Sequence, residues 1–306
     1  MSSGMIAGFG FSTIQKRDLS DLDDILSRIE DLGASHAELS LGGADLICGG
    51  RILGPRVARL ERICARHRLR YTAHGPLAAN FMDPVHQDAY TAAVGALLEV
   101  CGALGVTALV QHSGRGPAAP PAEIERLHRV ERDALRALGD VGARHAVKLA
   151  VETLWVFDRG QYTATAARLA EEIRRIDHPF VCGTLDFSHV YLYSTFLGLD
   201  FRAQIEAFAP VAGHLHVHDS FGRPKLTPMY APSEELAFGL GDLHLPLGWG
   251  DIPWDDLLPQ LTFQDDTAFI IELPPQFAEE APAVAAEARR LIGLAGTPAE
   301  RSRPQR

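Results

Sequence analysis

Carboxylates and imidazoles recur at one kind of position in this sequence, near the last residue of a short apolar segment. Such side chains are rare at buried strand positions unless they are paired or bound to a metal ion. Six consecutive segments, which read YTAH, LVQH, LAVE, GTLD, HLHVH and FIIE, each supply at least one of them. In chain order these residues are His74, His112, Glu152, Asp186, His216 and Glu272. Their repetition predicts one shared site.

Three more potential ligands lie in the adjoining loops. His189 follows Asp186 by three residues in DFSH, so one helical turn can direct both side chains to the same centre. Asp242 and His244 form the motif DLH after a long segment with several Pro and Gly residues. All of these groups offer nitrogen or oxygen and none offers a thiolate, a set that suits Zn, Mn, Fe or Co. The pattern therefore predicts a site for divalent metal ions.

The elements that must position these residues alternate regularly along the chain. Apolar, β-rich runs are separated by stretches such as LSDLDDILSRIEDLG and ATAARLAEEIRRID, whose apolar residues recur at helical spacing. Strict alternation favours a parallel sheet, and eight units favour an α/β fold closed as a single (β/α)8 TIM barrel with its site at the strand ends. The predicted strands are Ile6–Ser12, Ala37–Leu41, Arg70–His74, Ala108–His112, Lys148–Glu152, Phe180–Asp186, His214–His218 and Ala268–Glu272.

With these motifs the chain resembles the xylose isomerase-like TIM-barrel superfamily, which includes sugar-phosphate isomerases and epimerases and the endonuclease IV group. Keto-sugar epimerases of that superfamily hold a single divalent ion on strands five to eight. The resemblance transfers this role to the matching residues here, which are Glu152, Asp186, His216 and Glu272.

The endonuclease IV group adds further ligands and implies as many as three ions per chain. The first ion would be held by His74, His112 and a bridging Glu152, and the third by His189, Asp242 and His244. DNA-repair members also carry a tyrosine after the strand-three histidine and an Asn- and Gln-rich stretch after strand two. The segments HGPLAANF and SLGGADLICGG lack both features, and the net charge of −10 also disfavours a nucleic-acid partner.

Two reactions fit these residues, and we favour the first over the second. The first is isomerisation or epimerisation of a sugar, keto-sugar or sugar derivative, in which a divalent ion stabilises an enediolate while Glu152 and Glu272 move protons on opposite faces of the carbon. The second is hydrolysis of a small-molecule or nucleotide-type phosphoester by an endonuclease IV-like phosphodiesterase with several metal ions. A lone ion favours the first reaction and a filled cluster favours the second.

Residues near these ligands are candidates for substrate binding. Ser220–Leu240 is a long segment with several Pro and Gly residues, which predicts a lid over the site, and the Gly-rich segment Ser40–Leu53 could also face it. Arg115, Arg223 and Lys225 could pair with a phosphate or carboxylate, so we expect an anionic small molecule.

Aromatic and histidine side chains near the predicted ligands are less specific signals. Trp155 and Trp249 could each stack on a sugar ring or pack in the core. His218, at a strand end, could orient a ligand or touch substrate. His214 lies two residues deeper on the same strand face, which favours a core or hydrogen-bonded role.

Composition sets the remaining expectations. Residues 1–295 are expected to form the barrel, and 296–306, which read GTPAERSRPQR, a flexible tail. No apolar run reaches the length of a membrane span, and no export signal is readable at the N-terminus. The four cysteines are scattered, which predicts a reduced cytoplasmic location. Association into a homo-oligomer stays open.

Overall fold

The barrel strands pair side by side in parallel and close on themselves. The structure, a computed structural model, describes residues 5–295. Its sheet is a closed barrel in the order β1-β12-β11-β10-β8-β6-β5-β2, which confirms the predicted (β/α)8 fold. The strands are β1 (Ile6–Ser12), β2 (His36–Leu39), β5 (Arg70–His74), β6 (Ala108–His112), β8 (Lys148–Glu152), β10 (Val181–Asp186), β11 (Ala212–Val217) and β12 (Thr267–Ile271).

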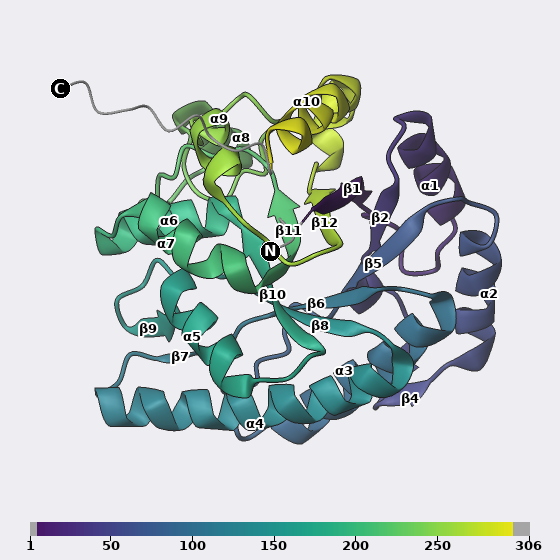
Figure 1. Cartoon of the computed structure of the whole chain (residues 1–306), viewed down its shortest axis with the longest axis horizontal. Helices are drawn as coiled ribbons and strands as arrows, with labels where there is room; N and C mark the ends of the chain where they lie inside the picture. The colour runs from purple at the N-terminus through teal and green to yellow at the C-terminus, as the bar shows by residue number, and fades with distance from the viewer. Residues whose placement is uncertain (1–4, 296–306) are drawn as a thin grey trace.

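Helices surround the barrel (Figure 1), and most of them bury an apolar face. In the first helix, for example, Leu22, Leu26 and Ile29 recur at helical spacing and are buried. The helices are α1 (Leu22–Asp31), α2 (Gly54–Cys64), α3 (Gln87–Leu104), α4 (Pro121–His145), α5 (Ala166–Ile176), α6 (Phe187–Leu197), α7 (Phe201–Phe208), α8 (Pro232–Phe238), α9 (Trp254–Leu257) and α10 (Ala281–Leu294). The longest helix described, α4, runs beneath the barrel in the view of Figure 1, beside α3.

Smaller elements lie in the connecting segments. Residues 40–53 form a 3-10 turn and a two-stranded hairpin, and a second two-stranded antiparallel sheet joins the loop after β6 to the loop after β8. These elements are η1 (Leu41–Gly43), β3 (Ile47–Cys48), β4 (Arg51–Ile52), β7 (Arg115–Pro117), β9 (Gln161–Thr163), η2 (Ala209–Val211), η3 (Leu258–Gln260) and η4 (Pro275–Glu280).

The observed strands differ from the predicted ones mainly at their ends. The second strand ends at Leu39 instead of Leu41, because the chain turns into η1. The seventh begins at Ala212 and ends at Val217, so His218 lies just beyond it. Glu272 likewise follows the end of β12. The predicted tail, residues 296–306, lies outside the described residues.

Strand register brings the chemically active residues to one level. In the parallel ladders His112 pairs with Glu152, and Asp186 pairs with His216. Because the strands are parallel and their side chains alternate between two faces, these residues meet at the C-terminal mouth of the barrel.

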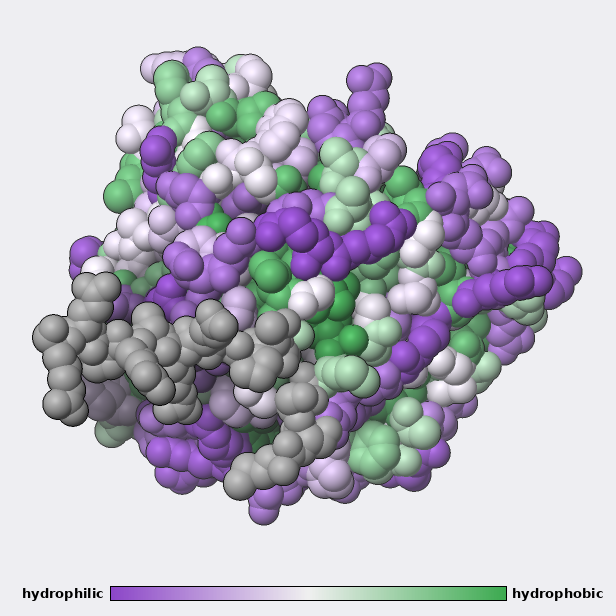
Figure 2. All heavy atoms as spheres, turned by 45° about the horizontal axis from the view of Figure 1, so that its top comes forward, coloured by the Kyte–Doolittle hydropathy of each residue, from purple (hydrophilic) through white to green (hydrophobic). Residues whose placement is uncertain are grey.

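Apolar side chains fill the space between the strands and the surrounding helices. Phe187, Phe208 and Phe269 are among the largest side chains that are fully buried. On the face shown in Figure 2, hydrophilic residues cover most of the surface and apolar residues form small patches between them. Within residues 5–295 no helix combines the length and the apolar character needed to cross a membrane.

Candidate metal centre

A cavity of about 730 Å³ opens at the C-terminal ends of the strands. Its lining includes most of the potential ligands: His74, His112, Glu152, His189, Asp242, His244 and Glu272. Asp186 and His216 are fully buried. Asp186 contacts the lining residue His189, and His216 contacts the lining residue Glu152. The structure therefore brings all nine predicted side chains together.

Glu152, at the end of β8, joins two parts of this site. Its Oε2 atom lies 3.2 Å from Nε2 of His74 and 3.3 Å from Nε2 of His112. Its Oε1 atom lies 3.0 Å from Nδ1 of His216. A carboxylate that faces two groups of imidazoles with different oxygens has the arrangement of a bridging ligand.

Asp186 ends β10 and also caps the helix that follows. Its Oδ1 atom accepts a hydrogen bond of 2.8 Å from the backbone N–H of His189, three residues on, as expected of an aspartate at a helix N-cap. Its Oδ2 atom lies 3.1 Å from Nε2 of His218 and 3.5 Å from Nε2 of His189. The spacing of DFSH thus directs the carboxylate and the imidazole to one place.

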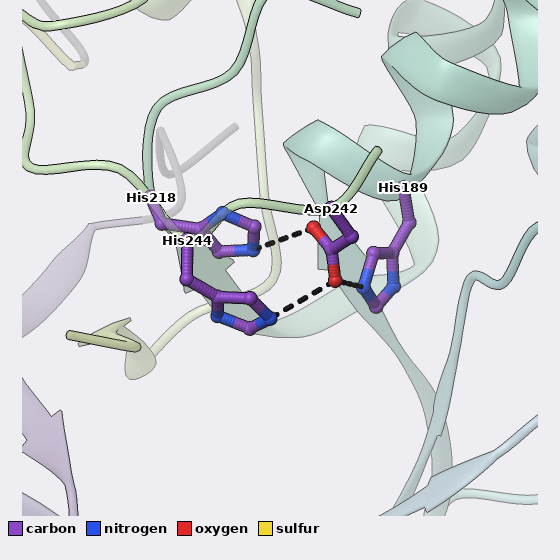
Figure 3. A group of neighbouring side chains, drawn as sticks. All are labelled: His189, His218, Asp242 and His244. Atoms are coloured by element: carbon purple, nitrogen blue, oxygen red, sulfur yellow. Dashed lines mark hydrogen bonds and ion pairs between the residues drawn. The ribbon is translucent and has the colours of Figure 1, made fainter. Parts of the chain in front are cut away.

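Asp242 and His244 approach from the loop before α9. Oδ2 of Asp242 lies 2.9 Å from Nε2 of His244 and 3.3 Å from Nε2 of His189 (Figure 3). The rings of His218 and His244 stack with centroids 4.0 Å apart. His218 therefore belongs to this group of side chains, a position that the sequence left open between ligand support and substrate contact.

Several of these side chains have the proximity that a shared ion requires. Within each group, one possible ligand atom from every residue lies within 4.8 Å of the others. Among the described residues the groups are His74, His112 and Glu152; Glu152, Asp186, His216 and Glu272; His189, His218, Asp242 and His244; and Glu38, His214 and His216.

Backbone carbonyls fix which nitrogen of two histidines faces the site. Nδ1 of His74 donates a hydrogen bond of 3.0 Å to the carbonyl of Gly75, and Nδ1 of His189 donates one of 2.8 Å to the carbonyl of Thr153. In both rings Nε2 is left to face carboxylates. Metal-binding histidines have this pattern, because the outer hydrogen bond sets the tautomer.

Proton affinities in the cluster follow from the same contacts. Burial alone would lower the pKa of His74, but its bond to Glu152 outweighs burial and raises the pKa to about 9. Asp186 and Asp242 likewise overcome burial and raise the pKa of His189 to about 10. For His112, burial dominates and lowers the pKa to about 4.

These observations fit a divalent cation. In the metal-free protein, protons on the imidazoles balance the negative charge of the carboxylates. A bound cation can replace those protons. The outer hydrogen bonds already orient two rings for ligation. The donor set contains nitrogen and oxygen only, as the sequence predicted.

Glu38 is a member of the cluster that sequence reasoning missed. It lies on β2, lines the cavity, is 1% exposed and contacts both His214 and His216. The predicted strand ended at Leu41, so Glu38 was not among the residues expected at a strand end. A glutamate within a predicted strand was the available signal.

The predicted substrate contacts separate into two sets. Trp155 lines the cavity, and its ring centroid lies 4.3 Å from that of His189. Trp249 instead packs against Phe277 and is 49% exposed. Arg115 is exposed in β7 and, like Trp249, is not among the residues that line the cavity.

The long segment 220–240 does not form the lid that its length predicted. None of its described residues is among those that line the cavity. Arg223 lies over the ring of Phe221, and Lys225 forms an ion pair of 2.8 Å with Glu235, so both cations are engaged within the segment itself. Part of the segment folds into α8.

Other loops build the walls instead. Ser12 and Ile14 lie at and after the end of β1, Gly42 and Gly43 belong to η1, and Pro76, Leu77 and Ala78 follow β5. The Gly-rich segment after β2 therefore faces the site, as its composition suggested. Gly42 is required there because a Cβ atom would lie 2.3 Å from the carbonyl oxygen of Gly75.

The fold is a closed parallel barrel, and carboxylates and histidines cluster at its mouth. These two features place the protein among TIM-barrel proteins with a candidate metal centre. The model of one protein family, described as xylose isomerase-like TIM barrel, matches residues 26–293. The chain belongs to this family. The resemblance inferred from the motifs is thereby confirmed.

Solved structures with the same fold include sugar epimerases. A D-tagatose 3-epimerase-like protein is 17% identical, with a TM-score of 0.69 over 94% of this chain and 98% of that chain. The 3-keto-D-glucoside 4-epimerase YcjR from E. coli is 17% identical, with a TM-score of 0.65 over 93% and 99%. A Thermus thermophilus protein, TTHB071, soaked with ZnCl2, is 20% identical, with a TM-score of 0.66 over 94% and 99%. No curated protein matches the sequence.

Proposed function

We propose that this protein is a divalent-metal-dependent epimerase or isomerase of a sugar or sugar derivative. The observation that carries the proposal is the group Glu152, Asp186, His216 and Glu272, whose ligand atoms lie within 4.8 Å of one another beside a cavity large enough for a small molecule. Membership of the family and the epimerases among the structural neighbours support it.

Glu152 and Glu272 are the proposed proton-transfer residues. A divalent ion bound by this group would supply positive charge that stabilises an enediolate. Glu272 is partly accessible and lines the cavity, whereas the side chain of Glu152 is 2% exposed. Approaching the substrate from different strands, one carboxylate removes the proton from carbon and the other returns one to the opposite face.

The cavity walls favour an uncharged substrate. Among the described residues that line the cavity there is no lysine or arginine. The anionic substrate expected from the sequence depended on Arg115, Arg223 and Lys225, which lie elsewhere. Ile14 and Leu77, 57% and 62% exposed, provide apolar contacts at the rim, and Trp155 offers a ring on which a sugar can stack.

Solvent exchange tests the proposed chemistry directly. The metal-loaded protein is incubated in D2O with D-fructose, D-tagatose and a 3-keto-glucoside, and the sugar carbons are followed by NMR. Deuterium should enter the carbon next to the carbonyl, and the epimer should accumulate. Glu272→Gln is the control, because it retains the side-chain shape without the base. If no sugar of a broad keto-sugar panel exchanges or changes configuration, the proposal is wrong.

Hydrolysis of a phosphoester is the second candidate. It is favoured by the group of His189, His218, Asp242 and His244, which could hold a further ion beyond the epimerase quartet. The walls argue against it, because a phosphodiester would meet no lysine or arginine among the described lining residues. Hydrolysis of bis(4-nitrophenyl) phosphate by the fully metal-loaded protein would support this alternative.

A further inference from the structure

Glu38 contacts three buried side chains, those of His214, His216 and Thr72. Its Oε1 atom lies 3.0 Å from Nε2 of His216, and its Oε2 atom lies 3.1 Å from Nε2 of His214. The hydroxyl of Thr72, which pairs with Glu38 in the ladder between β2 and β5, lies 3.4 Å from Oε2. All four side chains belong to residues that are at most 1% exposed.

These contacts reach across the barrel. Glu38 is on β2 and the two histidines are on β11, and these strands are not neighbours in the closed sheet. A carboxylate with no partner in such a place would be strongly destabilising, because burial removes its water. Two imidazole N–H groups and one hydroxyl replace that water, so the position of Glu38 is well defined.

The ring of His216 is consequently held from both sides. Nε2 faces Glu38, while Nδ1 faces Glu152 at 3.0 Å and Glu272 at 3.6 Å. This arrangement resembles that of His74 and His189, whose outer nitrogens bind backbone carbonyls. Only His216, of these three, has a carboxylate as its outer partner.

We infer that Glu38 is a positioning residue that fixes His216 with Nδ1 toward the metal site and increases the electron-donating power of that nitrogen. The inference rests on the proposed function, because it requires an ion in the group of Glu152, Asp186, His216 and Glu272. A carboxylate that accepts the outer N–H of a ligating histidine fixes its tautomer and raises the basicity of the ligating nitrogen. His214 and Thr72 hold Glu38 in place for this role.

The group Glu38, His214 and His216 could alternatively be an ion site in itself. That arrangement requires both nitrogens of His216 to lose their protons, since Nδ1 faces the other site. It also leaves an ion with three protein ligands that are all fully buried. The hydrogen-bonded arrangement needs neither condition.

Metal binding by Glu38→Gln tests the inference. The variant keeps the shape of the side chain but removes its charge, so His216 loses its anionic partner. The affinity for one Co²⁺ or Zn²⁺ ion, measured by competition with a chelator, should fall by about 10- to 100-fold. The visible absorption of Co²⁺ bound in the same site should shift, because the ligand field of His216 weakens.

Glu172→Gln is the matched control. Glu172 is also a buried carboxylate, 2% exposed, but it lies on α5 and pairs with arginines outside the barrel. Its variant should lose thermal stability while keeping the affinity and absorption of the bound Co²⁺. This comparison separates loss of stability from loss of ligand positioning.

The outcomes are distinct. If the parent protein binds no divalent ion, both the proposed function and the role of Glu38 are wrong. If the parent binds the ion and Glu38→Gln binds it with equal affinity and an unchanged spectrum, only the positioning role is wrong. If His214→Asn removes one full equivalent of metal from the parent stoichiometry, the buried group is an ion site and the positioning role is replaced.

Discussion

Oε1 of Glu152 lies 3.0 Å from Nδ1 of His216, and this contact joins two strands that are not neighbours in the barrel. The other oxygen of Glu152 faces His74 and His112, so one carboxylate links the two ends of the cluster. The shape of the whole site therefore depends on Glu152.

The substitution Glu152→Gln or Glu272→Gln should abolish turnover. Each removes a negative ligand together with a candidate base, and general acid–base groups alone contribute about 10²- to 10⁴-fold to a rate. Epimerisation of the active sugar is the measurement, and circular dichroism should show an intact fold. Full activity in Glu272→Gln would contradict both candidate mechanisms.

Asp242→Asn separates the two candidate reactions. Asp242 contacts His189 and His244 but is not a member of the group that contains Glu152 and Glu272. For an epimerase that uses one ion, measurable activity should remain, with a loss much smaller than that of Glu272→Gln. Equal losses in the two variants would instead support the multinuclear hydrolase.

Metal affinity should rise with pH until the cluster has lost its protons. In the metal-free protein the pKa values of His74 and His244 are raised to about 9 and that of His189 to about 10. Because metal must displace these protons, binding of Zn²⁺ at neutral pH should release protons to the buffer. Calorimetry in buffers of different ionisation enthalpy measures that release, and a binding enthalpy independent of buffer would contradict it.

The raised pKa values of these histidines also determine how the stability of the metal-free protein changes with pH. A histidine with a raised pKa stabilises the fold fully below its unfolded value of about 6.5, and this stabilisation is lost as pH rises through the folded value. The Tm of the metal-free protein should therefore fall as the pH approaches about 9. The metal-loaded protein should show a smaller fall, since its imidazoles are bound to the ion.

The double substitution Arg223→Ala and Lys225→Ala should leave KM nearly unchanged. Both cations have partners within their own segment, at Phe221 and Glu235. Added salt should then affect the parent and the variant alike. Trp155→Leu is the comparison, because Trp155 lines the cavity and its loss should raise KM. A large rise in KM in the double variant would restore the anionic substrate predicted from the sequence.

Gly42→Ala should destabilise the protein by about 1–3 kcal/mol, in the range of an overpacked site. The added Cβ would lie 2.3 Å from the carbonyl oxygen of Gly75, which is backbone and cannot move aside by rotation. Gly43→Ala is the matched control, because its Cβ would meet no described atom within 4 Å. Urea denaturation of both variants measures the difference.

The sequence by itself predicted the barrel and the meeting of its strand-end ligands. That is possible because both depend on local rules: strands and helices alternate, side chains alternate along a strand, and parallel strands end at the same edge. His112 and Glu152 follow these rules directly, since they are paired in register. Asp186 and His189 do so through the N-cap of α6.

Only the tertiary structure decided the role of residues whose partners are distant in the chain. Glu38 meets His214 and His216 across the barrel, a contact of two strands that are not neighbours and that no local pattern encodes. The direction of a loop is equally non-local, because it depends on what the loop packs against. For that reason Trp155 lines the cavity while Trp249 packs on Phe277.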